Sequence, residues 1–170
     1  YVTPSFDYST RELSGAVVND NFFSDSLIPL RLHPKIRYCT AHWASGNSWE
    51  ESGVIDYYQQ MFKRFNSSGV GFDKLRNFND VYHRLSILDD IYSESKKSGF
   101  LKTRYQLNLS PSEFNEKGGI LVHLDSKNNF ILGGGFHRLA IAKILGLESI
   151  PAVIGFVSHK SFPFVKGSLV

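Results

Sequence analysis

The feature that most constrains the fold is a run of three glycines, Gly133 to Gly135, between a strand-like and a helix-like segment. Residues 130–132 are apolar and suit a strand. From Phe136 the apolar residues recur at helical rather than alternating spacing, at Leu139, Ile141, Ala142 and Leu145. Gly146 stands where a left-handed helix C-cap is expected, and residues 152–157 form an extended apolar run. The segment therefore predicts a strand, a glycine turn, a helix and a second strand.

The first turn of the expected helix is a candidate anion site. A helix that starts directly after glycines points free N–H groups and the positive end of its dipole at the turn. His137 and Arg138 lie in this first turn, where the dipole disfavours cations and an anionic ligand would relieve the cost. Alternatively, the glycines allow close strand–helix packing, with Arg138 solvated and His137 hydrogen-bonded.

Two familiar phosphate motifs do not fit this turn. Arg138 stands where the third glycine of the dinucleotide fingerprint would be, and the Gly-Lys-Ser/Thr ending of a P-loop is missing. An anion site and a purely structural turn both remain open from the residues alone.

The segment Gly-Gly-Phe-His-Arg at 134–138, with residues 139–146 and the Ile-Pro-Ala-Val run at 150–153, resembles the ParB/sulfiredoxin-like superfamily over about residues 120–160. A looser resemblance to its stand-alone members runs from about His33 through residues 49–53. The resemblance implies an α/β (α+β) fold, a small mixed sheet flanked by helices. It also implies nucleotide binding by the glycine turn, since members bind CTP, ATP or ADP there. The nucleotide-binding residues would be Gly133, Gly134, Gly135, Phe136, His137 and Arg138, with His137 and Arg138 on the phosphates.

Two departures narrow the chemistry that the resemblance implies. Phe136 stands where sulfiredoxin has its catalytic cysteine, which excludes that reaction. His137 replaces the glutamate of chromosome-partition members, which argues against their metal-assisted CTP hydrolysis. The histidine form is nearer to the enzyme branch, which includes a free-serine kinase.

Glu50 and Glu51 are candidate general bases, able to take a proton from a substrate hydroxyl beside the phosphates. The serine kinase branch places a catalytic glutamate near the start of its domain. Ser48 and Glu51 also fit a capping box for the helix that follows, which explains Glu51 structurally. Capping is favoured for Glu51, and Glu50 is left open.

Trp43 and Trp49 lie in residues 38–49, a stretch of little periodicity that is expected to be a loop. Such residues can stack on the base or sugar of a substrate, or anchor the loop on the domain. Anchoring is the favoured interpretation, and substrate stacking is the alternative.

The remaining elements and boundaries follow from periodicity and turn residues. Strands are expected at 27–32, 101–107 and 120–124, the last joined to residues 130–132 by a hairpin turn, with His123 in the core or facing a cross-strand partner. Helices are expected from about 54 to 65 and from Asn77 or Asn79 to Gly99. This gives an arm (1–25), a domain (26–160) with a helical insertion (about 54–99), and a tail (161–170).

Composition limits the function classes. A formal charge of +3 and a pI near 9.0 permit an anionic ligand but do not favour a DNA-coating protein. The single cysteine, Cys39, excludes an intramolecular disulfide and a cysteine-rich zinc site, and a buried, inert thiol is expected. No stretch approaches the roughly 20 apolar residues of a membrane span. The default location is cytoplasmic, although the start at Tyr1 leaves a preceding segment open.

Together these features predict a nucleotide-dependent, kinase-like phosphotransferase. It would use ATP/ADP or CTP, with Mg²⁺ whose ligands the sequence does not identify, on a small-molecule or sugar acceptor. His137 and Arg138 would act with Glu50 or Glu51 in catalysis. The alternatives are a nucleotide-gated, DNA-associated ParB-like protein (a CTP/ATP switch or nuclease-like) and a non-catalytic binding domain. The weak net charge and the absence of a recognisable helix-turn-helix after residue 157 argue against the DNA reading.

Overall fold

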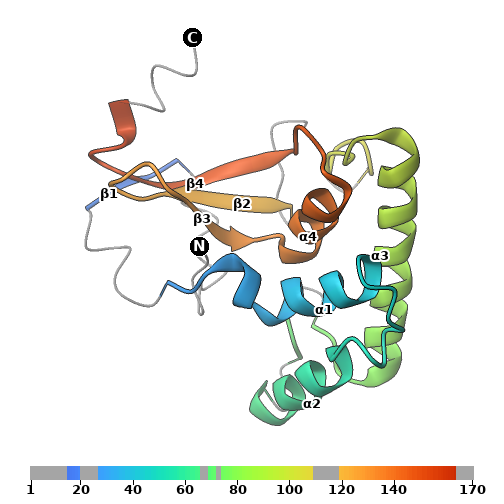
Figure 1. Ribbon diagram of the computed structural model, residues 1–170. Helices are drawn as coiled ribbons and strands as arrows, with labels where there is room; N and C mark the ends of the chain where they lie inside the picture. Colours follow the sequence, from blue (N-terminus) through green and yellow to red (C-terminus); the bar gives the residue numbers. More distant parts are fainter. Residues whose placement is uncertain (1–14, 20–26, 66–68, 72–73, 109–118, 164–170) are drawn as a thin grey trace. The chain divides into compact units, whose positions relative to one another are not determined.

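The computed structural model describes residues 15–19, 27–65, 69–71, 74–108 and 119–163. In them four strands and four α-helices form a mixed α/β structure (Figure 1). The elements in chain order are β1 (Val17–Val18), the 3₁₀ helix η3 (Leu30–Leu32), α1 (Pro34–Trp43), α2 (Val54–Phe65), α3 (Phe78–Ser98), β2 (Ile120–Leu124), β3 (Phe130–Gly134), α4 (Phe136–Leu145) and β4 (Ala152–Ser158). The expected α/β class is confirmed.

The chain divides into two compact units, which are described separately. The sheet unit comprises residues 1–33, 102–138 and 151–170, and therefore holds the strands and the first turn of α4. The helical unit comprises residues 34–101 and 139–150, and holds α1, α2, α3 and the rest of α4.

The four strands form one sheet in the order β1-β4-β2-β3. Strand β4 runs parallel to β1 and β2, whereas β2 and β3 are antiparallel neighbours. The predicted hairpin is confirmed, because Leu124 pairs with Phe130 around a turn in which the N–H groups of Lys127 and Asn129 each donate to Asp125 Oδ1 at 2.8 Å. Partial burial by itself would raise the pKa of Asp125. The hydrogen bonds from Asn129 and Lys127 outweigh burial, so the pKa of this carboxyl is lowered.

Local capping signals mark the start and the end of α3 and the end of α4. The Asn77 side chain accepts a hydrogen bond from the Asp80 N–H, and the Asp80 side chain accepts one from the Asn77 N–H. Helix α3 therefore starts at a capping box. Gly99 ends α3 with a left-handed φ of 75°. After α4, the N–H of Gly146 donates to Lys143 and that of Leu147 to Ala142, the pair of bonds of a Schellman motif.

Two predicted strands are wrong. Residues 27–32 contain η3 instead, and residues 34–43 form α1 rather than a turn and loop. Pro34 starts α1 because proline lacks an N–H that the first helical position does not need. Residues 101–107 contain no strand, because the side chains of Thr103 and Gln106 bond each other's N–H groups and start a helical turn.

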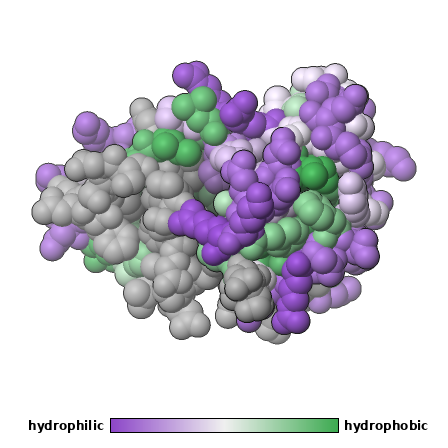
Figure 2. Space-filling view, turned by 90° about the horizontal axis from the view of Figure 1, so that it is seen from below, coloured by the Kyte–Doolittle hydropathy of each residue, from purple (hydrophilic) through white to green (hydrophobic). Residues whose placement is uncertain are grey.

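Several smaller expectations can be compared with the described residues. Cys39 is fully buried, and burial chiefly raises the pKa of its thiol, as expected of an inert cysteine. Of the expected arm, Val17 and Val18 pair with β4, while residues 1–14 and 20–25 lie outside the described part, as do tail residues 164–170. None of the described helices has the length and apolar character that a membrane crossing needs. On the face in Figure 2, hydrophilic residues are interspersed with smaller hydrophobic groups.

Candidate functional site

Gly135 makes the turn from β3 into α4 possible for two reasons. Its φ of +75° is left-handed, and a Cβ at this position would lie 2.5 Å from both the Gly119 carbonyl oxygen and Ile120 Cα. These distances leave no room for any side chain against the backbone at the start of β2. The chain therefore passes from the buried Gly134, paired with Leu121, into α4 within one residue.

Gly133 has a different role, since it makes room for a histidine. The His123 side chain is fully buried on β2, and a Cβ on Gly133 would lie 2.2 Å from its Nε2. On the other neighbouring strand, a Cβ on Gly155 would lie 2.4 Å from His123 Cε1 and Nδ1. The imidazole thus occupies the space of two missing side chains. His123 lies in the core, as expected.

Both strands beside His123 are irregular at this point. Leu121 and Val122 pair with Gly134 and Leu132, so Gly133 is an extra residue in β3. In β4 two residues, Gly155 and Phe156, lie opposite His123 alone. The Phe156 N–H donates to His123 Nδ1 at 2.8 Å, which satisfies a backbone group that the bulge takes out of the regular ladder.

The first turn of α4 contains Phe136, His137 and Arg138, all in the sheet unit. Arg138 is only 5% exposed, and its Nη2 donates to the carbonyl oxygen of Lys102. The expectation of a solvated Arg138, part of the purely structural interpretation, is therefore wrong. The Phe136 ring stacks on His33 with the ring centroids 4.0 Å apart. His137 is half-buried.

Charge is unevenly distributed over the described residues of the sheet unit. Asp125 is the one carboxylate among them, and it follows the far end of β2 from the glycine turn. At about 3.3 Å per residue, the length of β2 separates the two by roughly 13 Å. The basic residues of this part are Arg31, Lys102, Arg104, Lys127, Arg138 and Lys160. Of these, Arg138 lies in the first turn of α4 and bonds the Lys102 carbonyl, whereas Lys127 lies in the hairpin turn beside Asp125.

The predicted bases Glu50 and Glu51 lie in the helical unit, in the turn before α2. The Ser48 N–H and hydroxyl donate to Glu51 Oε2 at 3.0 and 2.9 Å, and the Glu51 N–H donates to Ser48 Oγ at 3.2 Å. This is the reciprocal pattern of the predicted capping box, and the two bonds from Ser48 lower the pKa of Glu51. Glu50 is hydrogen-bonded to Tyr82, whose pKa is raised by desolvation and by the charge of Glu50.

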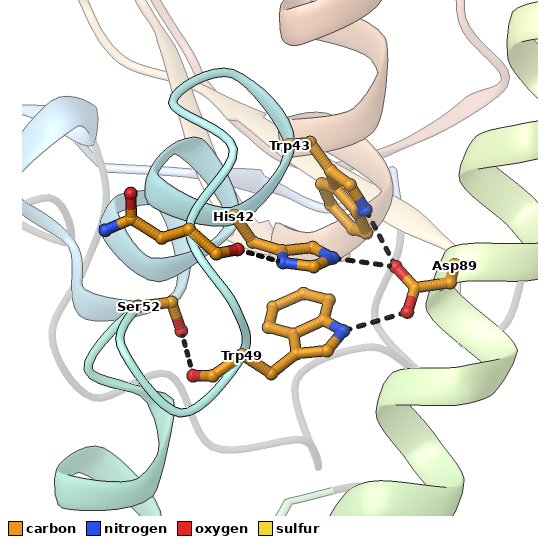
Figure 3. A network of polar contacts seen from close by, with 6 residues as sticks. His42, Trp43, Trp49, Ser52 and Asp89 are labelled. Atoms are coloured by element: carbon orange, nitrogen blue, oxygen red, sulfur yellow. Dashed lines mark hydrogen bonds and ion pairs between the residues drawn. The ribbon is translucent and has the colours of Figure 1, made fainter.

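Trp43 and Trp49 also lie in the helical unit, where both bind Asp89 of α3 (Figure 3). The Trp43 indole N–H donates to Asp89 Oδ1 at 2.9 Å and that of Trp49 to Oδ2 at 2.8 Å. Trp43 stacks on Tyr92, and Trp49 stacks on His42. Both indoles therefore have structural partners on one face and at their N–H groups, in line with an anchoring role. Substrate stacking stays a prediction.

Sequence reasoning missed the residues that organise these clusters. His42 and Asp89 are 47 positions apart, and no local pattern connects them. The contact of His33 with Phe136 was missed as well, because the two residues lie on elements far apart in the sequence. The structure thus brings the six glycine-turn residues together in one unit and places Glu50, Glu51, Trp43 and Trp49 in the other. In the described ranges, no group of three or more His, Cys, Asp or Glu side chains is suited to a metal ion.

Comparison of this chain with protein-family models, with curated proteins and with solved structures finds no match. The resemblance to the ParB/sulfiredoxin-like superfamily stays an expectation from the sequence, carried by residues 134–146 and 150–153 and more loosely by the stretch from His33 to residue 53.

Proposed function

We propose that the protein binds a nucleoside di- or triphosphate (ATP/ADP or CTP) through the glycine turn and acts as a phosphotransferase on a small-molecule or sugar hydroxyl. The observation that carries the proposal is the position of α4. It starts directly after Gly135, whose left-handed backbone directs the helix away from β3. The first N–H groups of α4 have no acceptor within the helix and bear its positive dipole end.

The charge around the turn supports a phosphate as the ligand. The Arg138 side chain donates a hydrogen bond to the backbone carbonyl oxygen of Lys102. The only described carboxylate of this unit, Asp125, follows the end of β2 that is farther from the turn. Phosphate groups carry the charge and the acceptor oxygens that such surroundings favour.

His137 is the side chain proposed to contact the phosphates directly. Arg138 is buried and already donates to Lys102, so it contributes positive charge and braces the 102 segment at the same time. His137, half-buried in the same helical turn, retains accessible surface. The expected division is direct contact from His137 and charge from Arg138.

Phosphoryl transfer requires positioning and charge neutralisation more than covalent chemistry by the protein, which suits such a site. The two predicted bases, Glu50 and Glu51, belong to the helical unit, so no general base is assigned to the site of the sheet unit. The described residues include no group of three or more His, Cys, Asp or Glu side chains suited to a metal ion, so the ligands of the expected Mg²⁺ are not assigned.

The test is binding of ATP, ADP, CTP and GTP, with and without Mg²⁺, by thermal shift and calorimetry. The wild type is compared with His137→Ala and with a matched control, His159→Ala, an exposed histidine after β4 in the same unit. One nucleotide should stabilise the wild type and the control, and its affinity should fall about tenfold or more in His137→Ala, the loss of a hydrogen bond to a charged group. Equal affinity in all three proteins, or no binding at all, would overturn the proposal.

A nucleotide that binds then allows the transfer step to be tested. Phosphorus NMR with pooled sugars and small hydroxyl compounds should show loss of the terminal phosphate of the nucleotide and a new phosphate ester. If a nucleotide binds but stays intact with every acceptor, the phosphotransferase proposal is wrong and the protein is a nucleotide-binding domain without this activity.

A further inference from the structure

The positive charge of the chain is concentrated in the helical unit, where α2 is connected to α3. Between Asp56 and Asp80 the sequence holds four basic residues and one acidic residue, Asp73, which lies outside the described ranges. This excess of +3 equals the formal charge of the whole chain, so the other residues sum to zero. The basic set consists of Lys63, Arg64, Lys74 and Arg76, all of which are exposed. Such a local excess attracts a polyanion even though the total charge is small.

Packing holds the two ends of this connection together. Helix α2 lies beside the start of α3 (Figure 1), and the Phe62 ring contacts the Phe78 ring edge-on, with the centroids 5.5 Å apart. Between the helices Val70 and Leu75 exchange both backbone hydrogen bonds, at 2.8 and 3.0 Å, so the chain folds back on itself. The basic residues that end α2 and those that precede α3 therefore belong to one compact surface.

Lys74 has a backbone conformation that suits another residue type better. Its φ of +49° is left-handed, and the only other non-glycine residues of the described chain with positive φ are two asparagines, Asn108 and Asn128. Asparagine visits this region readily, whereas a lysine pays for it in steric strain. The turn is also tight, since a Cβ on Gly69 would lie 2.7 Å from the Lys74 carbonyl oxygen. An exposed lysine at a strained position indicates that its charge is used.

An exposed aromatic ring lies among these cations. Phe65, the last residue of α2, is 43% exposed, and the guanidinium carbon of Arg64 lies 5.5 Å from the centroid of its ring. No carboxylate within the described ranges forms an ion pair with any member of the basic set. Cations beside an aromatic face are the combination that binds single strands, because bases stack on the ring while phosphates contact the cations.

Two other polyanionic partners fit this surface less well. A duplex offers phosphates but keeps its base faces stacked on each other, so it would not use the Phe65 ring. A lipid surface is bound by the apolar face of an amphipathic helix. In α2 this face is turned inward, with Val54 and Tyr58 buried.

We infer that the connection between α2 and α3 binds single-stranded nucleic acid, with Phe65 stacking on a base and the basic set contacting phosphates. Each phosphate contact releases counterions from the strand. The logarithm of the affinity should therefore fall with the logarithm of the salt concentration, with a slope of about −0.7 per contact and about −3 for the whole set. This inference does not depend on nucleotide binding at the glycine turn.

Fluorescence anisotropy with labelled single strands of about 12 nucleotides, one of RNA and one of DNA, tests the inference over a range of salt concentrations. The wild type should bind at least one strand with a slope near −3, and Lys63→Ala or Arg76→Ala should each reduce the slope by about 0.7. Phe65→Ala should weaken binding about fivefold or more and leave the slope unchanged, the loss expected for one stacked base.

The same unit offers a matched control for each kind of change. Lys97 is an exposed lysine in the last turn of α3, roughly 30 Å along the helix from its start. Phe100, just after α3, is 46% exposed, close to the exposure of Phe65. Lys97→Ala and Phe100→Ala should both bind like the wild type.

Lys74→Asn separates binding from folding. It should weaken binding and reduce the salt slope by about 0.7, while the midpoint of thermal unfolding stays the same or rises, because asparagine accepts the left-handed conformation. A lower midpoint with unchanged binding would show that Lys74 serves the fold alone and would contradict the inference. So would no binding of either strand at about 50 mM salt, or losses in Lys97→Ala and Phe100→Ala equal to those in Lys63→Ala and Phe65→Ala. Binding to anionic lipid vesicles but to neither strand would assign the surface to a membrane instead.

Discussion

At the scale of single residues, Gly135 and Gly146 illustrate two different reasons for a glycine: a left-handed backbone conformation and a lack of space for a side chain. Both have left-handed φ values, +75° and +63°. A Cβ on Gly146 would meet nothing within 4 Å, whereas one on Gly135 would be pressed into backbone atoms of Gly119 and Ile120. Only Gly135 is closed to a methyl group by its surroundings.

We therefore expect different costs for the same substitution. Gly146→Ala should lose about 1 kcal/mol of unfolding free energy, the cost of the left-handed conformation. Gly135→Ala should lose more than about 3 kcal/mol, because backbone must also move. Urea unfolding followed by circular dichroism measures both. Similar losses in the two variants would show that the tight contact at Gly135 is relieved without cost.

At the scale of elements, β2 is fitted to its neighbours through one side chain. His123 occupies the space above Gly133 and Gly155, and its Nδ1 accepts the Phe156 N–H where the register shifts. The first glycine of the candidate site is thus explained by a buried histidine ten residues earlier rather than by a ligand.

The coupling between Gly133 and His123 can be measured by a double-mutant cycle. Gly133→Ala should cost about 2 kcal/mol or more in the wild type, because the methyl group would overlap the imidazole. In a His123→Ala background the same substitution should cost about 1 kcal/mol less or be neutral. Unfolding free energies of the four proteins give the coupling. Additive costs would show that the ring moves aside and does not define the glycine.

How far the sequence predicts an element depends on whether its signal is local. The start of α3 at Asn77 (one of two expected caps), the left-handed cap Gly146 after α4 and the hairpin turn at Asp125 were predicted, and all three depend on residues within five positions of each other. Helix α1 was missed because its buried residues are few, namely Ile36, Tyr38 and Cys39. The segment 101–107 was missed because side chain–backbone bonds outweigh its strand propensity.

At the scale of the molecule, the non-local contacts are what the sequence could not supply. The glycine turn was found from its residues, but the burial of Arg138 against Lys102 joins positions 36 apart. The contacts of Asp89 with His42 and Trp43 join positions more than 40 apart. Such contacts depend on how the elements pack, which neither periodicity nor spacing contains.

The distribution of charge in the sheet unit gives a last prediction about the proposed phosphate site. Lys102 is bonded through its backbone to Arg138 beside the glycine turn, whereas Lys127 lies in the hairpin turn at the far end of β2. Both side chains carry one charge. The length of β2 places the hairpin turn roughly 13 Å from the glycine turn. Attraction over this distance is largely screened at physiological salt, where the Debye length is about 8 Å, but not at about 0.01 M.

Lys102→Ala should therefore weaken binding of the nucleotide at physiological salt, by about threefold to tenfold for a charge near the phosphates. Lys127→Ala should change it only at low ionic strength. Calorimetric titrations of both variants at the two salt concentrations test this. If the two lysines had equal effects at physiological salt, the phosphates would not lie at the glycine turn, and a nucleotide that still bound would have to occupy another part of the molecule.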